Sequence, residues 1–190
     1  ALFYPVVKAN AYGHGYKAVT KEIESLVHGL SVATTEEALS VRKITKKSIL
    51  CMEGPYDLKE LNLLIRNQID LVIHSHRQID FLRGIKSLPR EIKVWIKIDT
   101  GMNRLGLSIT EANDLLVDKS KLNYKNLILI LSHFACSDNK LSKLNSIQIR
   151  EFKKFNDYFP KIKRSISNSH GIFLGNESKF DLTRPGIALY

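Results

Sequence analysis

The sequence has few cysteines, no long apolar run and fewer acidic than basic residues, and each deficit excludes a class of protein. Its two cysteines, Cys51 and Cys136, lie far apart in apolar surroundings, which gives neither a zinc-binding pattern nor a disulfide framework. No apolar run reaches the roughly 18 residues of a membrane span, and the first residues lack the basic start and apolar stretch of a signal peptide. We therefore expect a cytoplasmic protein with reduced thiols, no metal site and no membrane partner.

The shortage of acidic residues leaves a basic protein. Lys and Arg number 29 against 19 Asp and Glu, a net charge of +10. Such an excess raises the hypothesis of nucleic-acid binding. The lysines are spread over segments that resemble helix ends, loops and solvated helix faces, however, and no aromatic residues alternate with them. The pattern favours a lysine-rich surface, suited to anionic ligands, and we expect no nucleic-acid partner.

Short apolar runs recur along the chain, and each is followed by a segment with helical spacing. Their consecutive Val, Ile and Leu residues are typical of parallel strands buried on both faces. The predicted strands are residues 5–9, 30–34, 48–54, 70–75, 94–101, 127–135, 165–169 and 180–190. This alternation gives either an open doubly wound sheet or a closed barrel. Eight units favour a nearly complete (β/α)₈ TIM-type barrel of class α/β, although such barrels usually have about 250 residues.

The intervening segments have the features of helices with N-terminal caps. The main predicted helices are residues 16–26, 36–44, 56–67, 76–85, 108–118 and 141–158. The expected capping residues are Thr35, Asp57, Ser75 and either Ser108 or Thr110. No linker, repeat or low-complexity segment interrupts the series, so we expect one domain over residues 1–190.

Functional side chains of such barrels gather where strands end, and the end of the first predicted strand has an unusual residue there. Lys8 follows two valines, and burial disfavours the charged form of a lysine, leaving an amine that can attack a carbonyl group. Lys8 can equally extend to the barrel rim and reach water. In the run KANAYGHG that it opens, Tyr12 can donate to a phosphate, and Gly13 and Gly15 fit either close ligand approach or a plain tight turn.

The run VVKANAYGHG closely resembles the cofactor-lysine motif of the alanine racemases, in which the lysine forms a Schiff base with pyridoxal 5'-phosphate. Four further stretches resemble this family in the same order: LSVATTEEALSVR at 30–42, KIDTGMNRLGL at 97–107, SHFACSD at 132–138 and LTRPGIALY at 182–190. The resemblance spans the whole chain. It implies the family's cofactor-binding barrel domain over residues 1–190, without its C-terminal β-domain.

The resemblance implies how the cofactor would be held. Lys8 would form the Schiff base and act as one of two acid–base groups. Tyr12 and the Ser169 hydroxyl would bind the phosphate, and Asn168 would belong to the same site. The backbone of residues 186–187, Gly186 and Ile187, would complete the phosphate site.

It also implies roles for residues around the ring and the substrate. Arg184 would face the pyridine nitrogen, and since arginine keeps its proton, that nitrogen would stay unprotonated and the ring would be a weaker electron sink. His133 would lie beside Arg184 and hold it. Arg104 would contact the phenolic oxygen and the substrate carboxylate, and Met102 would border the substrate. Lys97, which is often carbamylated in the family, would be the partner of Arg104.

Two positions depart from the family pattern, and one part of its enzymes is missing. Asn103 replaces a common glycine, and His170 occupies a place where alanine is more usual, where it could add a pH-dependent contact near the phosphate. Alanine racemases are two-domain homodimers whose second acid–base group is a tyrosine of the partner's C-terminal domain. None of the 7 tyrosines here lies in a segment that resembles that C-terminal domain. We therefore expect a fragment, truncated at both ends and inactive alone.

The function implied is an isomerase that interconverts L-alanine and D-alanine and supplies D-alanine for the peptidoglycan of the cell wall. Two alternatives share part of the pattern. Single-domain pyridoxal-phosphate homeostasis proteins and barrel decarboxylases of basic amino acids have a lysine at the same strand end, but not KANAYGHG together with DTGMNRLG. A basic barrel that binds nucleic acid or phosphorylated metabolites would need no cofactor.

Overall fold

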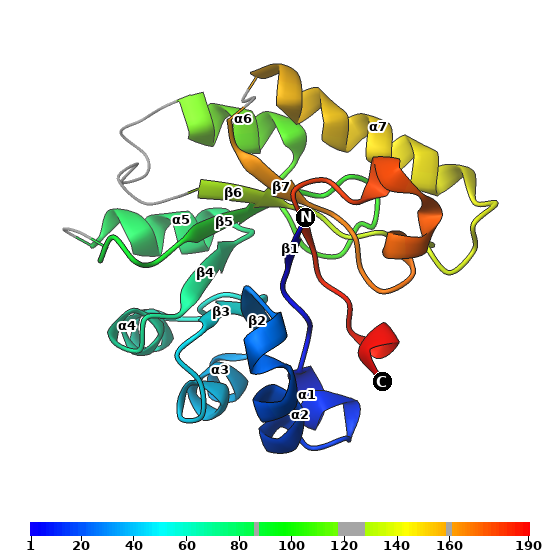
Figure 1. The fold of residues 1–190 in the computed structure, drawn as a ribbon. Helices are drawn as coiled ribbons and strands as arrows, with labels where there is room; N and C mark the ends of the chain where they lie inside the picture. The colour runs from blue at the N-terminus through cyan, green and yellow to red at the C-terminus, as the bar shows by residue number, and fades with distance from the viewer. Residues whose placement is uncertain (86–87, 118–127, 159–160) are drawn as a thin grey trace.

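The computed structural model describes residues 1–85, 88–117, 128–158 and 161–190, and its strands form a ring with the helices outside (Figure 1). The strands are β1 (Leu2–Phe3), β2 (Gly29–Val32), β3 (Ser48–Cys51), β4 (Asp70–Ile73), β5 (Val94–Lys97), β6 (Ile128–Leu131), β7 (Lys163–Ser165) and β8 (Leu182–Thr183). The α-helices are α1 (Lys8–Tyr12), α2 (Tyr16–Ile23), α3 (Thr35–Arg42), α4 (Leu58–Arg66), α5 (His76–Arg83), α6 (Ile109–Val117) and α7 (Lys143–Tyr158). Short 3₁₀ turns are η1 (Glu24–Leu26), η2 (Gly171–Leu174), η3 (Asn176–Ser178) and η4 (Ile187–Leu189).

The strands are parallel, and they close on themselves. Strands β2 to β7 form a six-stranded sheet in chain order, and β1 pairs with β8. Backbone hydrogen bonds join the two sheets at both edges: Val7 N–H donates to the Ser31 carbonyl at 2.8 Å, and Arg184 N–H donates to the Ser167 carbonyl at 3.0 Å. The predicted TIM-type barrel is therefore confirmed, and the open doubly wound alternative is wrong.

The core has two layers because alternate residues of each strand face opposite sides. In β4, Val72 packs inside the ring with Tyr4 and Trp95, whereas Leu71 and Ile73 pack outward under the helices. The ring interior is a packed core and not a channel, as expected for eight strands. No helix within the described ranges is long and apolar enough to cross a bilayer.

Three of the predicted helix caps are confirmed, and one is wrong. Asp57 and Ser75 accept hydrogen bonds from the third residue of α4 and α5, and Ser108 does the same for Glu111 at the start of α6. The cap of α3 is Thr34 and not Thr35, since Thr34 has an extended backbone and its hydroxyl accepts from Glu37 N–H. Thr35 is already inside the helix.

The predicted strands extend too far toward their carboxyl ends, and the first one is misplaced. The prediction of a strand over 5–9 is wrong: the ladder passes through β1 and a bridge at Val6, and the chain then turns at Lys8. Likewise β7 ends at Ser165, before the polar residues that the predicted strand included. The polar residues belong to the loops because they follow the last paired residue. Asp118 and Leu127, predicted at the ends of a helix and a strand, lie outside the described residues.

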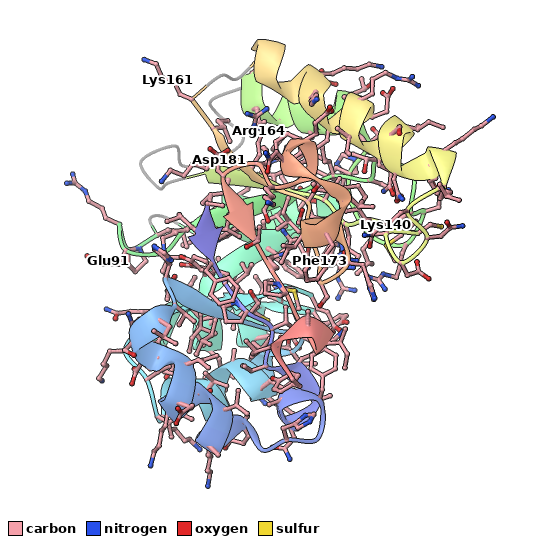
Figure 2. The ribbon with its side chains drawn as sticks, turned by 45° about the vertical axis from the view of Figure 1, so that its right-hand side comes forward. Glu91, Lys140, Lys161, Arg164, Phe173 and Asp181 are labelled. Carbon is pink, nitrogen blue, oxygen red and sulfur yellow. The ribbon has the colours of Figure 1, made fainter. Side chains whose placement is uncertain are left out.

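The end of the barrel at which the strands begin is closed by paired charges. The ammonium of Lys93, just before β5, donates to Ser48 Oγ at 2.7 Å and to the buried Asp70 carboxylate at 3.3 Å. Figure 2 shows Arg164 and Asp181 side by side near the starts of β7 and β8, where Arg164 N–H donates to the Asp181 carboxylate at 2.9 Å. Lys93 and Arg164 at this end therefore each have an acidic partner, since Arg164 Nε also lies 3.8 Å from the Asp181 carboxylate.

Candidate active site

A cavity of about 390 Å³ opens at the carboxyl ends of the strands. It is lined by every residue predicted for the site except Met102: Lys8, Tyr12, Lys97, Arg104, His133, Asn168, Ser169, Arg184, Gly186 and Ile187. The lining also includes residues that were not predicted for the site: Val6, Ala33, Met52, Glu53, Leu105 and Leu131. His170, noted as a departure from the family pattern, lines the cavity as well. Glu53 follows β3 closely, so the rule that functional residues follow strand ends would have found it.

Lys8 stands at the entry of a left-handed turn. The four residues after it, Ala9 to Tyr12, have φ angles of +49°, +54°, +55° and +53°. This conformation costs a residue other than glycine roughly 1–2 kcal/mol, so contacts outside the turn must hold it. The Glu37 carboxylate accepts from Ala9 N–H at 2.7 Å, and the side-chain oxygen of Asn10 accepts from Tyr16 N–H at 3.0 Å.

The left-handed turn ends at Tyr12, whose side chain lines the cavity and lies against Gly186. A Cβ atom at residue 186 would overlap the Tyr12 hydroxyl, so any larger residue there would displace the tyrosine ring. Burial raises the pKa of Tyr12, and its hydroxyl stays a donor. Beside it, Ser169 Oγ accepts from Gly186 N–H at 2.8 Å and from Ala188 N–H at 3.1 Å, which leaves the serine proton free for an anion. These hydroxyl groups are the donors that a phosphate requires.

Arg184 is held under the cavity by the strands themselves. Its side chain is 3% exposed, and the guanidinium donates to the Ser132 carbonyl at 2.6 Å and to the Ser165 hydroxyl. Burial lowers the pKa of Arg184 to about 10, so it stays charged at neutral pH. We expected His133 to hold Arg184, but no hydrogen bond joins these two side chains in the described part of the chain. His133 instead accepts from the Asn168 amide at 3.4 Å.

The titratable groups of the cavity lie in a positive field. Burial, followed by the charges of Arg104 and Arg184, lowers the pKa of Lys97 to about 8. Burial and the charge of Arg184 lower the pKa of His133 to about 3, so this histidine is neutral at physiological pH and can accept hydrogen bonds.

The cavity has more cations than anions. Lys8, Lys97, Arg104 and Arg184 line it, whereas Glu53 is the one carboxylate among its described lining residues. Such a cavity attracts anionic ligands. No group of three or more potential metal ligands occurs within the described ranges.

The loop after β5 brings Arg104 to the cavity. The Asp99 carboxylate accepts from the N–H groups of Gly101 and Met102 at 2.8 and 2.9 Å, which closes a tight turn. Asn103 has a φ of +56°, and asparagine adopts this region more readily than most residues. This explains how asparagine replaces the glycine of the family pattern.

A family model and curated relatives match nearly the whole chain. The family model described as alanine racemase, N-terminal domain, matches residues 1–190. The chain belongs to this family. The alanine racemase of Actinobacillus succinogenes is 40% identical over 187 residues, covering 97% of this chain and 52% of the relative. That of Haemophilus influenzae is 39% identical over 188 residues, covering 97% and 51%. The chain thus spans about half the length of the curated relatives it matches.

Solved alanine racemase structures have the same fold. The enzyme from Acinetobacter baumannii superposes with a TM-score of 0.90 at 31% identity, covering 100% of this chain and 56% of that one. The enzyme from Bartonella henselae, solved with covalently bound pyridoxal phosphate, gives 0.88 at 33% identity over 100% and 56%.

Proposed function

We propose that residues 1–190 form the cofactor-binding domain of a pyridoxal-phosphate-dependent alanine racemase, an isomerase acting on L-alanine and D-alanine. The observation that carries this proposal is the cavity itself. Its lining combines Lys8, a set of phosphate donors and a buried arginine that stays charged at neutral pH. The covalently bound cofactor of the Bartonella henselae relative supports the choice of pyridoxal phosphate.

The residues present fit this cofactor. Tyr12, Ser169 and the backbone of Gly186 and Ile187 would bind its phosphate, since these residues line the cavity and carry no negative charge. Asn168 supports this site, because its side-chain oxygen accepts from Ser137 Oγ at 2.8 Å and from Gly171 N–H at 2.9 Å. Lys8 would hold the cofactor covalently through its ε-amine. When bound, pyridoxal phosphate withdraws electron density from the α-carbon of an amino acid, so that the α-proton can leave.

The remaining cavity residues would control that proton and the substrate. Lys8 would remove or return the α-proton on one face. Arg104 would bind the substrate carboxylate, with Met102 near it on the same loop. Arg184 would donate to the ring nitrogen and keep it unprotonated, which restrains electron withdrawal and disfavours transamination. His133 is neutral at physiological pH and would accept hydrogen bonds beside Arg184.

The proposal includes carbamylation of Lys97. Because its pKa is lowered to about 8, part of the side chain is uncharged amine at neutral pH. An amine adds carbon dioxide and releases a proton, forming a carbamate anion that would pair with Arg104. Isotope-labelled bicarbonate should then give a carbamate signal in the nuclear magnetic resonance spectrum that is absent from Lys97→Met.

The second acid–base group is proposed to be a tyrosine supplied from outside residues 1–190 by a partner copy. Inversion needs a proton removed on one face of the α-carbon and returned on the other. The chain spans about half the length of its relatives, so the second group can come from the part that it does not cover. Leu105 and Ile187, which are 36% and 53% exposed at the cavity, offer apolar surface for a homodimer. The 190-residue chain alone should racemise alanine roughly 10²–10⁴-fold more slowly than the full-length protein. Equal rates would contradict this part of the proposal.

The cellular role follows from the product. D-alanine is a building block of peptidoglycan, so we propose a role in cell-wall synthesis. The free thiols of Cys51 and Cys136 support a reducing, cytoplasmic location.

The direct test is the reaction itself. Full-length protein incubated with pyridoxal phosphate and L-alanine should form D-alanine, measured by chiral chromatography, and Lys8→Ala should not. Decarboxylation of lysine or ornithine without racemisation of alanine would instead identify a barrel decarboxylase and overturn the proposal.

A further inference from the structure

One carboxylate joins two loops that border the cavity. Oε1 of Glu37 accepts from Ala9 N–H at 2.7 Å, and Oε2 accepts from Ala33 N–H at 2.8 Å and from Thr34 N–H at 3.4 Å. Ala9 directly follows Lys8, and Ala33 lines the cavity. The first residues of α3 therefore tie the loop after β1 to the loop after β2.

Only part of this arrangement serves the helix. The bond to Thr34 N–H, together with the bond from Glu37 N–H to Thr34 Oγ1, forms a capping box that satisfies N–H groups at the start of α3. The bond to Ala9 adds nothing to the cap, since it reaches back 28 residues to another strand–helix unit. It holds the first residue of the left-handed turn, where φ is +49°.

We propose that Glu37 is a positioning residue for Lys8. Its carboxylate keeps the turn at residues 9–12 in the left-handed conformation, and thereby sets where the Lys8 amine and the Tyr12 hydroxyl lie at the cavity. The proposal rests on the function proposed for Lys8 as the site of cofactor attachment.

Two substitutions of Glu37 test whether a carboxylate of this length is needed. Two acceptor oxygens can serve two loops, whereas the amide of Glu37→Gln has one acceptor and would turn an NH₂ group toward a backbone N–H donor. Glu37→Asp keeps the charge but is one methylene shorter, so it should reach Ala33 and Thr34 but lose Ala9. The two variants lose the same contact for different reasons.

Two control variants separate positioning from helix capping. Thr34→Ala removes the hydroxyl half of the capping box and leaves the carboxylate in place. Glu36→Gln makes the same charge change one residue earlier in α3, on an exposed side chain. Neither control touches Ala9.

The first readout is hydrogen–deuterium exchange of the protein without cofactor, followed by mass spectrometry of peptides that cover residues 7–13. Because a hydrogen bond to a charged acceptor is stronger than a neutral one, we expect the Ala9 amide to exchange about tenfold faster in Glu37→Gln and Glu37→Asp. Thr34→Ala and Glu36→Gln should match the wild type. Unchanged exchange in both Glu37 variants, or equal acceleration in Thr34→Ala, would overturn the proposal.

The second readout is the attachment of pyridoxal phosphate to Lys8, trapped with borohydride and mapped by peptide sequencing. Half-maximal labelling of Lys8 should need about tenfold more pyridoxal phosphate in Glu37→Gln, and the controls should label as the wild type does. Equal labelling of all variants would contradict the positioning role. Labelling of the wild type on another lysine would refute the proposed function instead, and the exchange experiment would still decide whether Glu37 holds the turn.

Discussion

Lys93, just before β5, and Lys97, the last residue of β5, differ in a way that distinguishes the two ends of the barrel. Lys93, where the strand begins, has a raised pKa: burial opposes its charge, but the nearby Asp70 carboxylate and the Tyr4 hydroxyl more than compensate. Lys97, where the strand ends, has a pKa lowered to about 8, because it is buried and faces Arg104 and Arg184. Lys93 and Lys97 are only four residues apart, yet the first is paired with a carboxylate and the second lies next to two other cations.

This difference indicates what each end is for. At the end with Lys93, this lysine and Arg164 have carboxylate partners. The other end has a cavity lined by four cations and one carboxylate among the described residues, and a left-handed turn of non-glycine residues. Perturbed charges and strained backbone persist where the rest of the fold holds them in place, and they cluster at functional sites. The end with the cavity, the open end, is therefore suited to an anionic ligand, and the end with Lys93, the closed end, is suited to stabilising the fold.

The largest effect should come from reversing the most buried cation of the open end. Arg184→Glu in the full-length enzyme should lower racemisation by roughly 10²–10³-fold, as loss of a preorganised donor does, and raise transamination, measured as pyruvate formation. A glutamate can give its proton to the ring nitrogen and strengthen the electron sink. An unchanged rate and product ratio would remove Arg184 from the role of ring partner.

Arg184→Lys is a more conservative substitution at the same position. It keeps the positive charge but not the planar set of donors that reaches Ser132 and Ser165. We expect a smaller loss of racemisation and a smaller rise in transamination than in Arg184→Glu. This variant keeps the test informative if Arg184→Glu does not fold. A lysine variant more prone to transamination than the glutamate variant would count against the electronic explanation.

At the closed end, Lys93→Met should destabilise the fold by about 3 kcal/mol, because it leaves the Asp70 carboxylate buried without its cation. Urea denaturation at pH 7 measures this loss. Since the folded pKa of Lys93 is raised, its contribution is complete below the pKa of an unfolded lysine and is lost as the pH rises through the folded value. A variant as stable as the wild type would show that the closed end is not held by this pair.

The matched change at the open end should have the opposite sign. In buffer free of cofactor and carbon dioxide, where Lys97 is an unmodified amine, Lys97→Met should stabilise the protein by about 3 kcal/mol at pH 7, because it removes a buried charge that has no carboxylate partner among the described residues. Since the folded pKa is lowered, the gain should be constant below pH 8 and shrink as the pH rises toward about 10.4, the value of an unfolded lysine. Urea titrations across this pH range measure the change. If Lys97→Met destabilised the protein, the charge of Lys97 would be as well compensated by its surroundings as that of Lys93.

Much of the fold follows from local patterns. The consecutive Val, Ile and Leu of segments such as DLVI predict parallel strands, and caps such as Asp57 and Ser75 predict where helices begin, because both depend on neighbouring residues alone. The strand ends were predicted poorly. Whether Lys8 or Asn168 belongs to a strand depends on pairing with distant backbone, which no local pattern contains.

The site was predictable where a residue follows a strand or matches a family motif. Nearly all the residues proposed from those signals line one cavity. The left-handed turn was not predicted, because alanine and asparagine have no preference that forces four successive positive φ angles. Glu37 was missed for a related reason. Its sequence neighbours indicate a helix cap, and its bond to Ala9 arises only when two loops meet in the folded barrel.

The central claim is that the open end of the barrel holds pyridoxal phosphate on Lys8. The most direct test is borohydride reduction of the full-length protein loaded with pyridoxal phosphate, followed by proteolysis and mass spectrometry of the modified peptide. The account predicts one pyridoxyl group, on Lys8 in the peptide that contains KANAYGHG. A pyridoxyl group on Lys97 or on a surface lysine, with Lys8 unmodified, would contradict it.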